Sequence, residues 1–404
     1  MHFLSTLYNL AWITPLVIGS ASTNTTARLG PPNAICTQKL YHLDVSSYNY
    51  MFQNVQDNAN MTYLTKLNQE YVGSFPYGSN FTDTYEAGMM EVTRTYAISG
   101  ILCVPLSGEK NASNVQYLIH GIGYDSSYWD FVVGDDETYS YVYASAAAGI
   151  ATFRYDRLGT GLSEAPPEAY NVVQKPTDVA IAIKFAEMLR SGEISGKPYT
   201  KIVLLGHSYG SIQSQALTAL APTAVDGVVL TGYSANATAL PLWWSSTAYT
   251  TASLIFPTRF SPTEFTNAYL VTESIWTSQL NNWYFPGYSQ TVADYARATE
   301  QPVTQGVLFT NANNITAAPD FKGDVLVVTG AQDWIFCYSN CYAVPPNSTY
   351  PNIPAYAQEL YPAANYFSTY LPENTGHIVN LHYSAPETYQ QILQFAEMVF
   401  TSSI

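Results

Sequence analysis

The stretch that decides the fold is Lys201-Ile202-Val203-Leu204-Leu205-Gly206-His207-Ser208-Tyr209-Gly210-Ser211. Its β-branched and aliphatic start predicts a buried strand that ends at Gly206. The residues from Ser211 to Leu220 predict a helix, which Pro222 ends. Ser208 therefore lies in a tight turn between a strand and a helix, at the centre of the pattern Gly-x-Ser-x-Gly.

Such a turn suits a nucleophile. It holds the serine backbone in a strained conformation and lifts the hydroxyl clear of the sheet, while Gly206 and Gly210 let strand and helix approach closely. The amide of Tyr209 opens the helix, where it can stabilise an oxyanion. We therefore predict Ser208 as the nucleophile. The alternative, a Gly-Ser turn without chemistry, would not explain the base and acid that follow in the right order.

A serine hydroxyl needs a base, because it is a poor nucleophile near neutral pH. His377 follows a predicted strand at residues 365–371 and precedes the last predicted helix, so it can reach the carboxyl edge of the sheet. We predict His377 as the base on this chain order. His382 is the competing choice, and its alternative role is structural.

The base in turn needs an orienting acid at the end of a strand between nucleophile and base. Asp333 comes shortly after the predicted strand that ends at Gly330, whereas Asp320 and Asp324 lie at the wrong end of that strand. The order Ser208, Asp333, His377 is the order of one known type of catalytic triad. The alternative role of Asp333 is to cap a turn.

A second oxyanion donor is expected from the loop His120-Gly121-Ile122-Gly123, which directly follows the predicted strand 115–119. Glycines allow such a loop to turn its amides inward. We expect the amide of Ile122 to act together with that of Tyr209, and loss of one such donor typically costs ~3 kcal/mol of transition-state stabilisation.

The strands and helices alternate along the chain, which predicts a mostly parallel α/β sheet with right-handed crossovers. An antiparallel pair, at 91–96 and 98–104, is expected to open the sheet. Further strands are predicted at 149–155, 227–232 and 324–330, and a helix at 177–190. About ninety residues separate two of these strands, too many for a loop, so they predict a small inserted domain.

These elements divide the chain into four parts. Residues 1–21 are expected to be a secretory signal peptide, because their apolar run is shorter than the ~20 residues of a membrane span and is followed by small residues. An N-terminal extension without a recognisable site occupies 22–85. The catalytic core is predicted at 86–233 and 324–404, and a lid at 234–323. The lid is rich in aromatic residues, some of which should line an apolar pocket.

The composition excludes some classes of partner. The 404 residues include 30 Asp and Glu against 15 Lys and Arg, a formal net charge of −15, so nucleic acid and anionic membranes would repel the chain. No later stretch is long and apolar enough to span a bilayer. No cysteine shows metal-site spacing with histidine, and we expect neither a metal nor a cofactor.

Two further features favour an extracellular protein. Sequons for N-glycosylation occur at Asn24, Asn60, Asn80, Asn111, Asn236, Asn314 and Asn347. The 4 cysteines allow three disulfide pairings, of which we favour Cys337–Cys341 with Cys36–Cys103, because the first pair is close in sequence. Buried free thiols are the alternative.

From about Glu86 to its C-terminus the chain resembles the α/β-hydrolase superfamily, and its sequons, extension and Tyr-rich insertion resemble the secreted fungal serine esterase and lipase-like members. The matching pieces are His120-Gly121, the loop Asp156 to Ser163, Gly206-His207-Ser208-Tyr209-Gly210, Asp333 and Gly376-His377. The resemblance implies a central sheet flanked by helices, with a lid inserted after the sixth strand. It also implies that Asp156 and Arg157 brace loops and take no part in the chemistry.

Three functions are compatible with these residues. The first is a secreted Ser-His-Asp hydrolase that cleaves an ester or lactone of an apolar or aromatic small molecule through an acyl-enzyme. The second is a non-hydrolytic enzyme of secondary metabolism on the same fold: a lyase, an acyl transferase or a cyclase. The third is a receptor or adhesion module, which is disfavoured because every triad member has a candidate.

Overall fold

The computed structural model describes residues 29–53, 63, 65–67, 69–70, 72–73, 85–236, 238–312, 315–344 and 348–402. The expected signal peptide lies outside these residues, as do the sequons at Asn24, Asn60, Asn80, Asn314 and Asn347. Of the two sequons within them, Asn111 is exposed and Asn236 is partly buried.

Within this part of the chain, eight strands form one sheet in the order β1-β2-β4-β3-β5-β6-β10-β11. Their bounds are β1 Ala34–Phe52, β2 Glu86–Pro105, β3 Asn114–Ile119, β4 Ala151–Tyr155, β5 Lys201–His207, β6 Gly227–Thr231, β10 Asp324–Val328 and β11 Phe367–Tyr370. The pairs β1–β2 and β2–β4 are antiparallel, and the others are parallel. The expected mostly parallel α/β sheet is confirmed.

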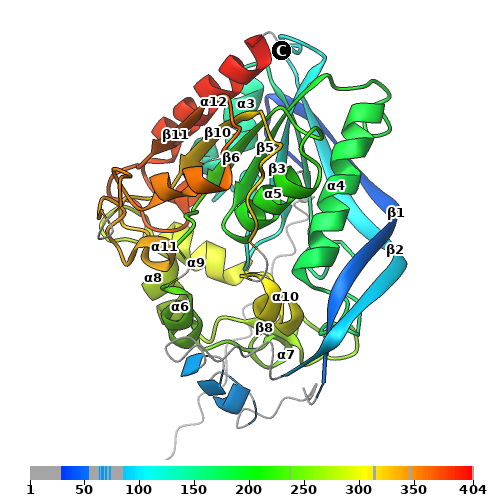
Figure 1. Ribbon diagram of the computed structural model, residues 1–404, viewed down its shortest axis with the longest axis vertical. Coiled ribbons are helices and arrows are strands. Elements are labelled where there is room, and N and C mark those ends of the chain that lie inside the picture. The colour runs from blue at the N-terminus through cyan, green and yellow to red at the C-terminus, as the bar shows by residue number, and fades with distance from the viewer. Residues whose placement is uncertain are drawn as a thin grey trace, which may run out of the picture.

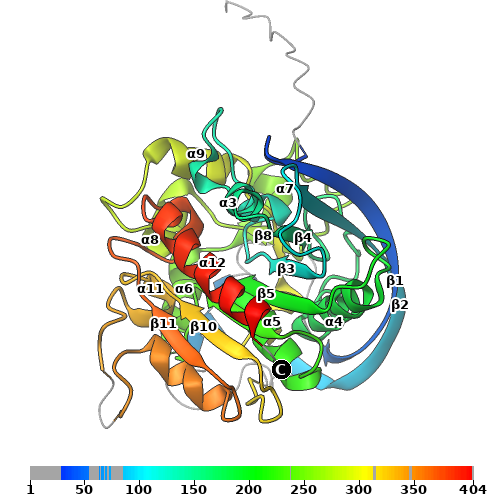
Figure 2. The same ribbon diagram turned by 90° about the horizontal axis from the view of Figure 1, so that it is seen from above.

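Helices cover both faces of this sheet (Figures 1 and 2). One face carries α4 (Lys175–Ser191) and α5 (Tyr209–Leu220), and the other carries α3 (Tyr141–Ala147) and α12 (Ala385–Thr401). The side chains of β5 alternate accordingly: Ile202 and Leu204 belong to one buried cluster, and Val203 and Leu205 to the other. Both faces of β5 are therefore buried, as a central parallel strand requires.

The antiparallel opening of the sheet differs from the expectation. Residues 91–96 and 98–104 are not two strands but parts of one long strand, β2, and its partner β1 comes from the segment expected to be an extension outside the core. The strand continues across the expected break because Ala97 pairs with His42, in register with Tyr96 and Ile98 on either side. Further along β2, Gly100 leaves room for the rings of Phe153 and Tyr41, to which a Cβ would approach within 2.9 Å. The two long strands curve around α4 in Figure 2.

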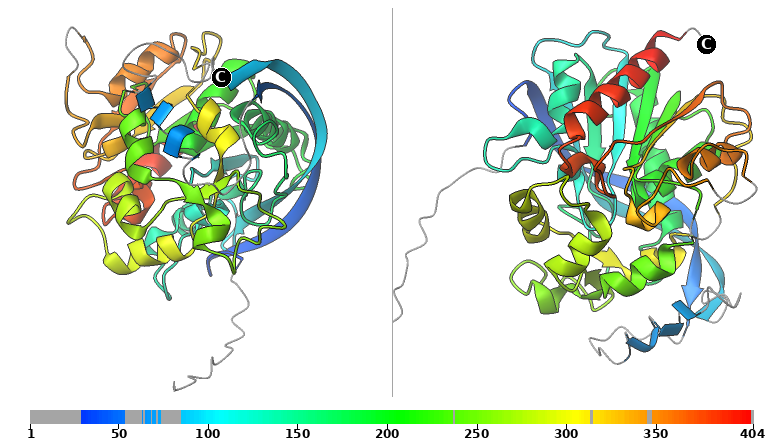
Figure 3. Two further views of the ribbon diagram at one scale, coloured as in Figure 1. Left: turned by 90° about the horizontal axis from the view of Figure 1, so that it is seen from below. Right: turned by 90° about the vertical axis from the view of Figure 1, so that its left-hand side faces the viewer.

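The segment between β6 and β10 lies below the sheet in Figure 1, beyond the carboxyl ends of the parallel strands, and Figure 3 shows the same arrangement from the side. Its strands β7 (Thr250–Thr251), β8 (Tyr269–Val271) and β9 (Val303–Thr304) form a second, antiparallel sheet. Its helices are α6 (Leu240–Thr247), α7 (Ala252–Ile255), α8 (Ile275–Asn282), α9 (Gln290–Ala298) and α10 (Gln305–Thr310).

The remaining described elements are short. They are α11 (Trp334–Cys337) and the 3-10 helices η1 (Ser126–Trp129), η2 (Glu137–Tyr139), η3 (Pro354–Leu360) and η4 (Val379–Leu381). Within the described ranges, none of the helices has both the length and the apolar character needed to traverse a bilayer.

Candidate active site

The turn between β5 and α5 places Ser208 at the carboxyl edge of the sheet. Ser208 has φ 54° and ψ −116°, a conformation that side-chain-bearing residues rarely adopt. A Cβ on Gly206 would lie 2.4 Å from the carbonyl oxygen of Gly210, and one on Gly210 would lie 2.2 Å from that of Ile119. The turn can therefore form only because both flanking positions are glycine.

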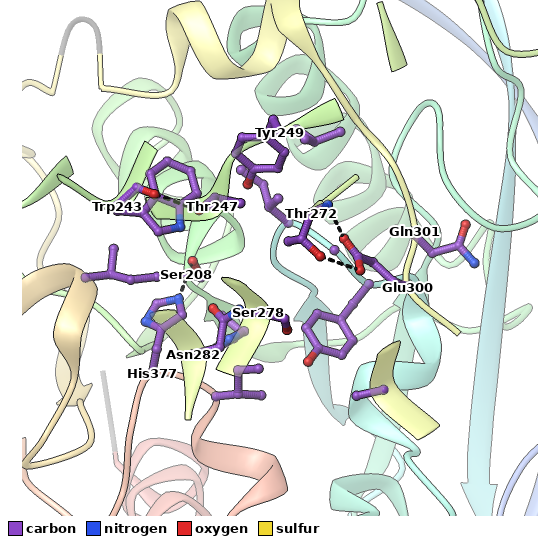
Figure 4. A pocket seen from close by; sticks show the side chains of 18 of the residues that line it. Ser208, Trp243, Thr247, Tyr249, Thr272, Ser278, Asn282, Glu300, Gln301 and His377 are labelled. Carbon is purple, nitrogen blue, oxygen red and sulfur yellow. Dashed lines mark hydrogen bonds between the residues drawn. The ribbon is translucent and has the colours of Figure 1, made fainter. Parts of the chain in front are cut away.

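Three predicted residues from distant parts of the chain meet at this edge, and Figure 4 shows two of them, Ser208 and His377. The Nε2 atom of His377 lies 2.8 Å from Ser208 Oγ, and its Nδ1 atom lies 2.8 Å from Asp333 Oδ2. Asp333 is fully buried and His377 is 3% exposed. The geometry is that of a nucleophile, a base and an orienting acid connected by hydrogen bonds.

The loop that carries Asp333 is fixed from several sides. Asp333 Oδ1 accepts a hydrogen bond of 3.0 Å from the amide of Phe336, so the carboxylate also caps α11. A disulfide joins Cys337 to Cys341, and the amide of Cys341 donates to the carbonyl of Ala331 at 2.9 Å. These contacts leave Oδ2 directed at His377. The second disulfide joins Cys36 to Cys103, which is the favoured pairing.

His382, the competing base, has a structural position. Its Nε2 atom accepts hydrogen bonds from the amides of Gly376 at 3.0 Å and Tyr284 at 3.2 Å, so the ring proton is on Nδ1, which donates to the carbonyl of Ile378 at 2.7 Å. Burial lowers the pKa of His382 to about 4. With both ring nitrogens engaged, His382 has no free atom with which to accept a proton from Ser208.

His120 and His207 are also engaged elsewhere. His120 Nε2 accepts from the amide of Arg157 at 3.0 Å and its Nδ1 donates to the carbonyl of Gly121 at 2.9 Å. His207 donates from Nδ1 to Thr231 Oγ1 at 3.1 Å. Burial lowers the pKa of both rings well below the usual value, so both stay neutral and support the loops around Ser208.

The two predicted oxyanion donors both border Ser208. The amide of Tyr209 belongs to the first residue of α5, and Ile122 lines the same pocket as Ser208. Neither amide forms a hydrogen bond within the described part of the chain. The loop passes close to Ser208, since a Cβ on Gly121 would lie 3.1 Å from the Cβ of Ser208. Both amides are therefore free to bind an oxygen atom of a ligand.

Asp156 and Arg157 hold loops. The carboxylate of Asp156 accepts hydrogen bonds of 2.9 Å from the amides of Ser126 and Leu162. Arg157 donates to Asp178 at 3.2 Å and lies over the ring of Tyr209, with its guanidinium carbon 4.7 Å from the ring centroid. Neither Asp156 nor Arg157 lines the pocket at Ser208.

Gln301, which sequence reasoning did not single out, connects three segments. Its amide donates to the carbonyl of Gly123 at 3.0 Å, and its side-chain nitrogen donates to Asp125 Oδ2 at 3.0 Å. Its side-chain oxygen accepts from the amide of Gly161 at 3.1 Å. Gln301 thus joins the β6–β10 segment to the loop of Ile122 and to the loop that follows β4.

The pocket above Ser208 is only partly apolar. Counting its open mouth, it contains about 610 Å³ of space outside the protein atoms. Trp243 is one of the aromatic residues of the predicted lid that line it. Most of its walls come from the β6–β10 segment. Its polar lining residues from that segment, apart from Gln301, are Thr247, Tyr249, Thr272, Ser278, Asn282 and Glu300. Sequence reasoning missed these residues, because no motif marks them and the prediction of a pocket rested on the aromatic residues of the segment.

No described cluster of three or more His, Cys, Asp or Glu side chains is arranged as a metal site. Ser208, His377 and the two free amides are the groups that this site offers for chemistry. Together they can support acyl transfer through a covalent intermediate.

The comparisons with known proteins agree with this architecture. The sequence model described as the alpha/beta hydrolase family matches residues 117–390. No curated protein matches the sequence.

Several solved structures are similar to the chain. A thermophilic esterase from Thermogutta terrifontis has 17% identity and a TM-score of 0.47, over 76% of this chain and 96% of that chain. The enol-lactonase from Burkholderia xenovorans LB400 has 17% identity and a TM-score of 0.45, over 75% and 97%. A meta-cleavage product hydrolase from Pseudomonas fluorescens IP01 has 17% identity and a TM-score of 0.44, over 75% and 95%. At these identities and TM-scores, the structural similarities do not indicate a reaction for this chain.

Proposed function

Since the chain belongs to the alpha/beta hydrolase family, we propose that it is a secreted serine hydrolase that cleaves an ester or lactone bond of an apolar or aromatic small molecule. The observation that carries the proposal is the pair of 2.8 Å contacts that link Ser208 to His377 and His377 to Asp333. An acyl-enzyme mechanism requires this connection, because the base must accept the hydroxyl proton as the nucleophile attacks.

The reaction begins when Ser208 Oγ attacks the carbonyl carbon and its proton passes to His377 Nε2. The carboxylate of Asp333 stabilises the resulting imidazolium through Nδ1. The carbonyl oxygen becomes negative, and the amides of Ile122 and Tyr209 donate hydrogen bonds to it. The imidazolium then protonates the leaving alcohol, which departs and leaves the acyl group on Ser208.

Water completes the cycle. His377 takes a proton from a water molecule that attacks the acyl-enzyme, and the second tetrahedral intermediate is stabilised by the same two amides. Its collapse returns the proton to Ser208 and releases the acid. In this scheme the β6–β10 segment acts as a lid that positions the substrate above Ser208.

The proposal is tested with a fluorophosphonate probe and a series of p-nitrophenyl esters of increasing chain length. Wild-type protein should be labelled at Ser208 and should hydrolyse some of the esters, and Ser208→Ala should lose both properties. Ser245→Ala, on the exposed side of α6, is the matched control and should retain them. Labelling and hydrolysis that survive in Ser208→Ala would refute the proposal.

Hydrolysis is distinguished from lyase, acyl-transfer or cyclisation chemistry by water labelled with heavy oxygen. A hydrolase must place one labelled oxygen in the product acid, because water attacks the acyl-enzyme. A product acid without label would favour the non-hydrolytic alternative.

Secretion is the other part of the proposal that needs its own test. The two disulfides support it, since disulfides persist in oxidising compartments. N-terminal sequencing of protein recovered from culture medium should find the mature chain beginning shortly after Ala21. Treatment with an N-glycosidase should lower its apparent mass, and a protein retained inside the cell would contradict the proposal.

A further inference from the structure

The pocket wall away from the triad is built by one end of the small antiparallel sheet. Thr250 pairs with Val271, so the next residues outward, Tyr249 and Thr272, lie side by side. Leu270 pairs with Val303, the first residue of β9. Glu300 precedes Val303 by three positions and therefore lies near the same end of the small sheet. Three loops of the β6–β10 segment thus converge there, and Figure 4 shows Thr272 and Glu300 across the pocket from Ser208 and His377.

Glu300 is a buried carboxylate with spare hydrogen-bonding capacity. It is 6% exposed. Its Oε2 atom accepts from the hydroxyl of Thr272 at 2.8 Å and from the guanidinium of Arg297. Among the residues that the structure describes, Oε1 accepts only from the amide of Thr272, at 2.7 Å. A carboxylate oxygen can accept two hydrogen bonds, so Oε1 has room for another donor. Arg297 balances the charge of Glu300 from behind.

Tyr249 supplies a second polar group at this wall. It is 4% exposed, and its ring is held edge-on by Trp243 and Trp244, at centroid distances of 5.9 and 6.1 Å. Within the described residues its hydroxyl forms no hydrogen bond, although buried tyrosine hydroxyls usually have a partner. Burial first, and then the negative charge of Glu300, raises the pKa of Tyr249 well above the usual value, so the hydroxyl stays protonated.

Building on the proposed function, we infer that the hydrolysed ester carries a hydroxyl group remote from the scissile bond, which binds between Glu300 Oε1 and the hydroxyl of Tyr249. A hydroxyl fits this pair because it can donate to the carboxylate and accept from the tyrosine at the same time. Leu270 and Val303 also line this pocket, beside its polar residues, and would contact an apolar part of the substrate. A hydroxylated aromatic ester has both properties.

Charged alternatives fit less well. A carboxylate or phosphate in this position would be repelled by Glu300. The described lining of the pocket contains no Lys or Arg, and the nearby Arg297 is already bound to Glu300 and Thr272. An ammonium group would find no full negative charge to neutralise, for the same reason. A neutral group that both donates and accepts hydrogen bonds would leave no buried charge unpaired.

The test uses two pairs of substrates that differ by one hydroxyl. The first pair is the p-nitrophenyl esters of phenylpropanoic acid and of its para-hydroxy derivative. The second is the acetates of phenylethanol and of its para-hydroxy derivative, which place the hydroxyl on the alcohol side. In one of the pairs, wild-type protein should favour the hydroxylated member about ten- to hundred-fold in kcat/KM, the range expected for a hydrogen bond to a charged group.

The preference should be lost in variants of the wall. Tyr249→Phe removes only a hydroxyl that has no described partner, so this variant should keep the fold. Glu300→Gln removes the negative charge of the carboxylate. Either should bring the kcat/KM ratio within a pair to within about three-fold of one. The matched control is Glu273→Gln, an exposed residue one position beyond Thr272, which should leave the ratio unchanged.

The outcomes separate this inference from the proposed function. If wild-type protein hydrolyses both members of each pair equally, or if both wall variants keep the wild-type ratio, the inference is overturned while ester hydrolysis by Ser208 stands. If no ester of any kind is hydrolysed in a Ser208-dependent way, the proposed function itself has failed.

Discussion

The Nε2 atom of His382 accepts a 3.0 Å hydrogen bond from the amide of Gly376, the residue directly before the proposed base His377. On the other side of the base, His382 Nδ1 donates to the carbonyl of Ile378 at 2.7 Å. One buried neutral ring thus holds the backbone on both sides of His377. Protonation of this ring would break the hydrogen bond to Gly376, because Nε2 could no longer accept.

The first prediction concerns stability at acid pH. Burial lowers the pKa of His382 to about 4 in the folded protein, below the ~6.5 of an unfolded histidine. The unfolded state therefore binds more protons between these values, and the contribution of His382 to the free energy of unfolding should fall by about 3 kcal/mol as the pH falls through this window. The free energy of unfolding of His382→Gln should lack this pH-dependent contribution. Urea unfolding at neutral pH and near pH 4.5 measures the difference.

The comparison between proteins isolates the effect of His382. Burial raises the pKa values of Asp156 and Asp178 to about 6, which gives pH dependence of the opposite sign, but both carboxyls are present in wild type and variant. His42→Gln, on the exposed side of β1, is the control. Equal pH dependence in wild type and His382→Gln would contradict the structural position assigned to the ring.

The second prediction concerns Asp333→Asn. The asparagine oxygen can still accept from the amide of Phe336, so the loop should keep its conformation. Its NH₂ group would then face His377 Nδ1, which would have to act as an acceptor, and the ring proton would move to Nε2 and point at Ser208. In that tautomer the base cannot accept the proton of Ser208, so kcat should fall by about 10⁴ with little change in KM.

This result is checked by ester kinetics and by unfolding of the same protein. Asp320→Asn, an exposed residue at the opposite end of β10, should leave kcat and stability unchanged. A loss of activity that is matched by a large loss of stability would indicate a structural role for Asp333 instead.

The third prediction separates the strain at Ser208 from its chemistry. At φ 54° a side chain is disfavoured by about 1–2 kcal/mol, whereas glycine is not. Ser208→Gly and Ser208→Ala should both be inactive, but the glycine variant should unfold with a free energy about 1 kcal/mol higher than the alanine variant. Thermal or urea unfolding of the two proteins measures the difference, and an alanine variant at least as stable as the glycine variant would exclude strain at this turn.

The fourth prediction concerns Gln301→Met, which keeps the size of the side chain but removes its hydrogen bonds to Asp125 and Gly161. The loop of Ile122 loses one of its supports, so the oxyanion donor should be less well placed and kcat should fall about ten-fold. KM should change less than kcat. Gln290→Met, exposed at the start of α9, is the control, and an equal effect in both variants would argue against a role in loop positioning.

The parts of the site that carry a motif could be predicted from the sequence. Ser208 was marked by its glycines, and Asp333 and His377 by their places after strands that end at one edge of a parallel sheet. The small sheet that gathers Tyr249, Thr272 and Glu300 could not be predicted, because its strands are two or three residues long and carry no periodic pattern.

The strand β1 was missed for a physical reason. Its inward positions include Ser47 and Asn49, which are polar because they bind the hydroxyl of Thr177 at 3.1 and 2.8 Å. The apolar alternation that marks a strand is therefore interrupted where β1 meets α4. The two short strands expected at 91–96 and 98–104 are separated only by Ala97, and the pairing of β2 with β1 continues through it, with Ala97 opposite His42.

The position of β1 limits how the protein can be shortened for recombinant production. A version that starts at Glu86 would retain every proposed catalytic residue, yet it would leave the outer edge of β2 without its partner and Cys103 without Cys36. An unpaired edge of that length is a template for intermolecular association. Aggregation, and not the loss of proposed catalytic residues, should therefore determine how short an active protein can be.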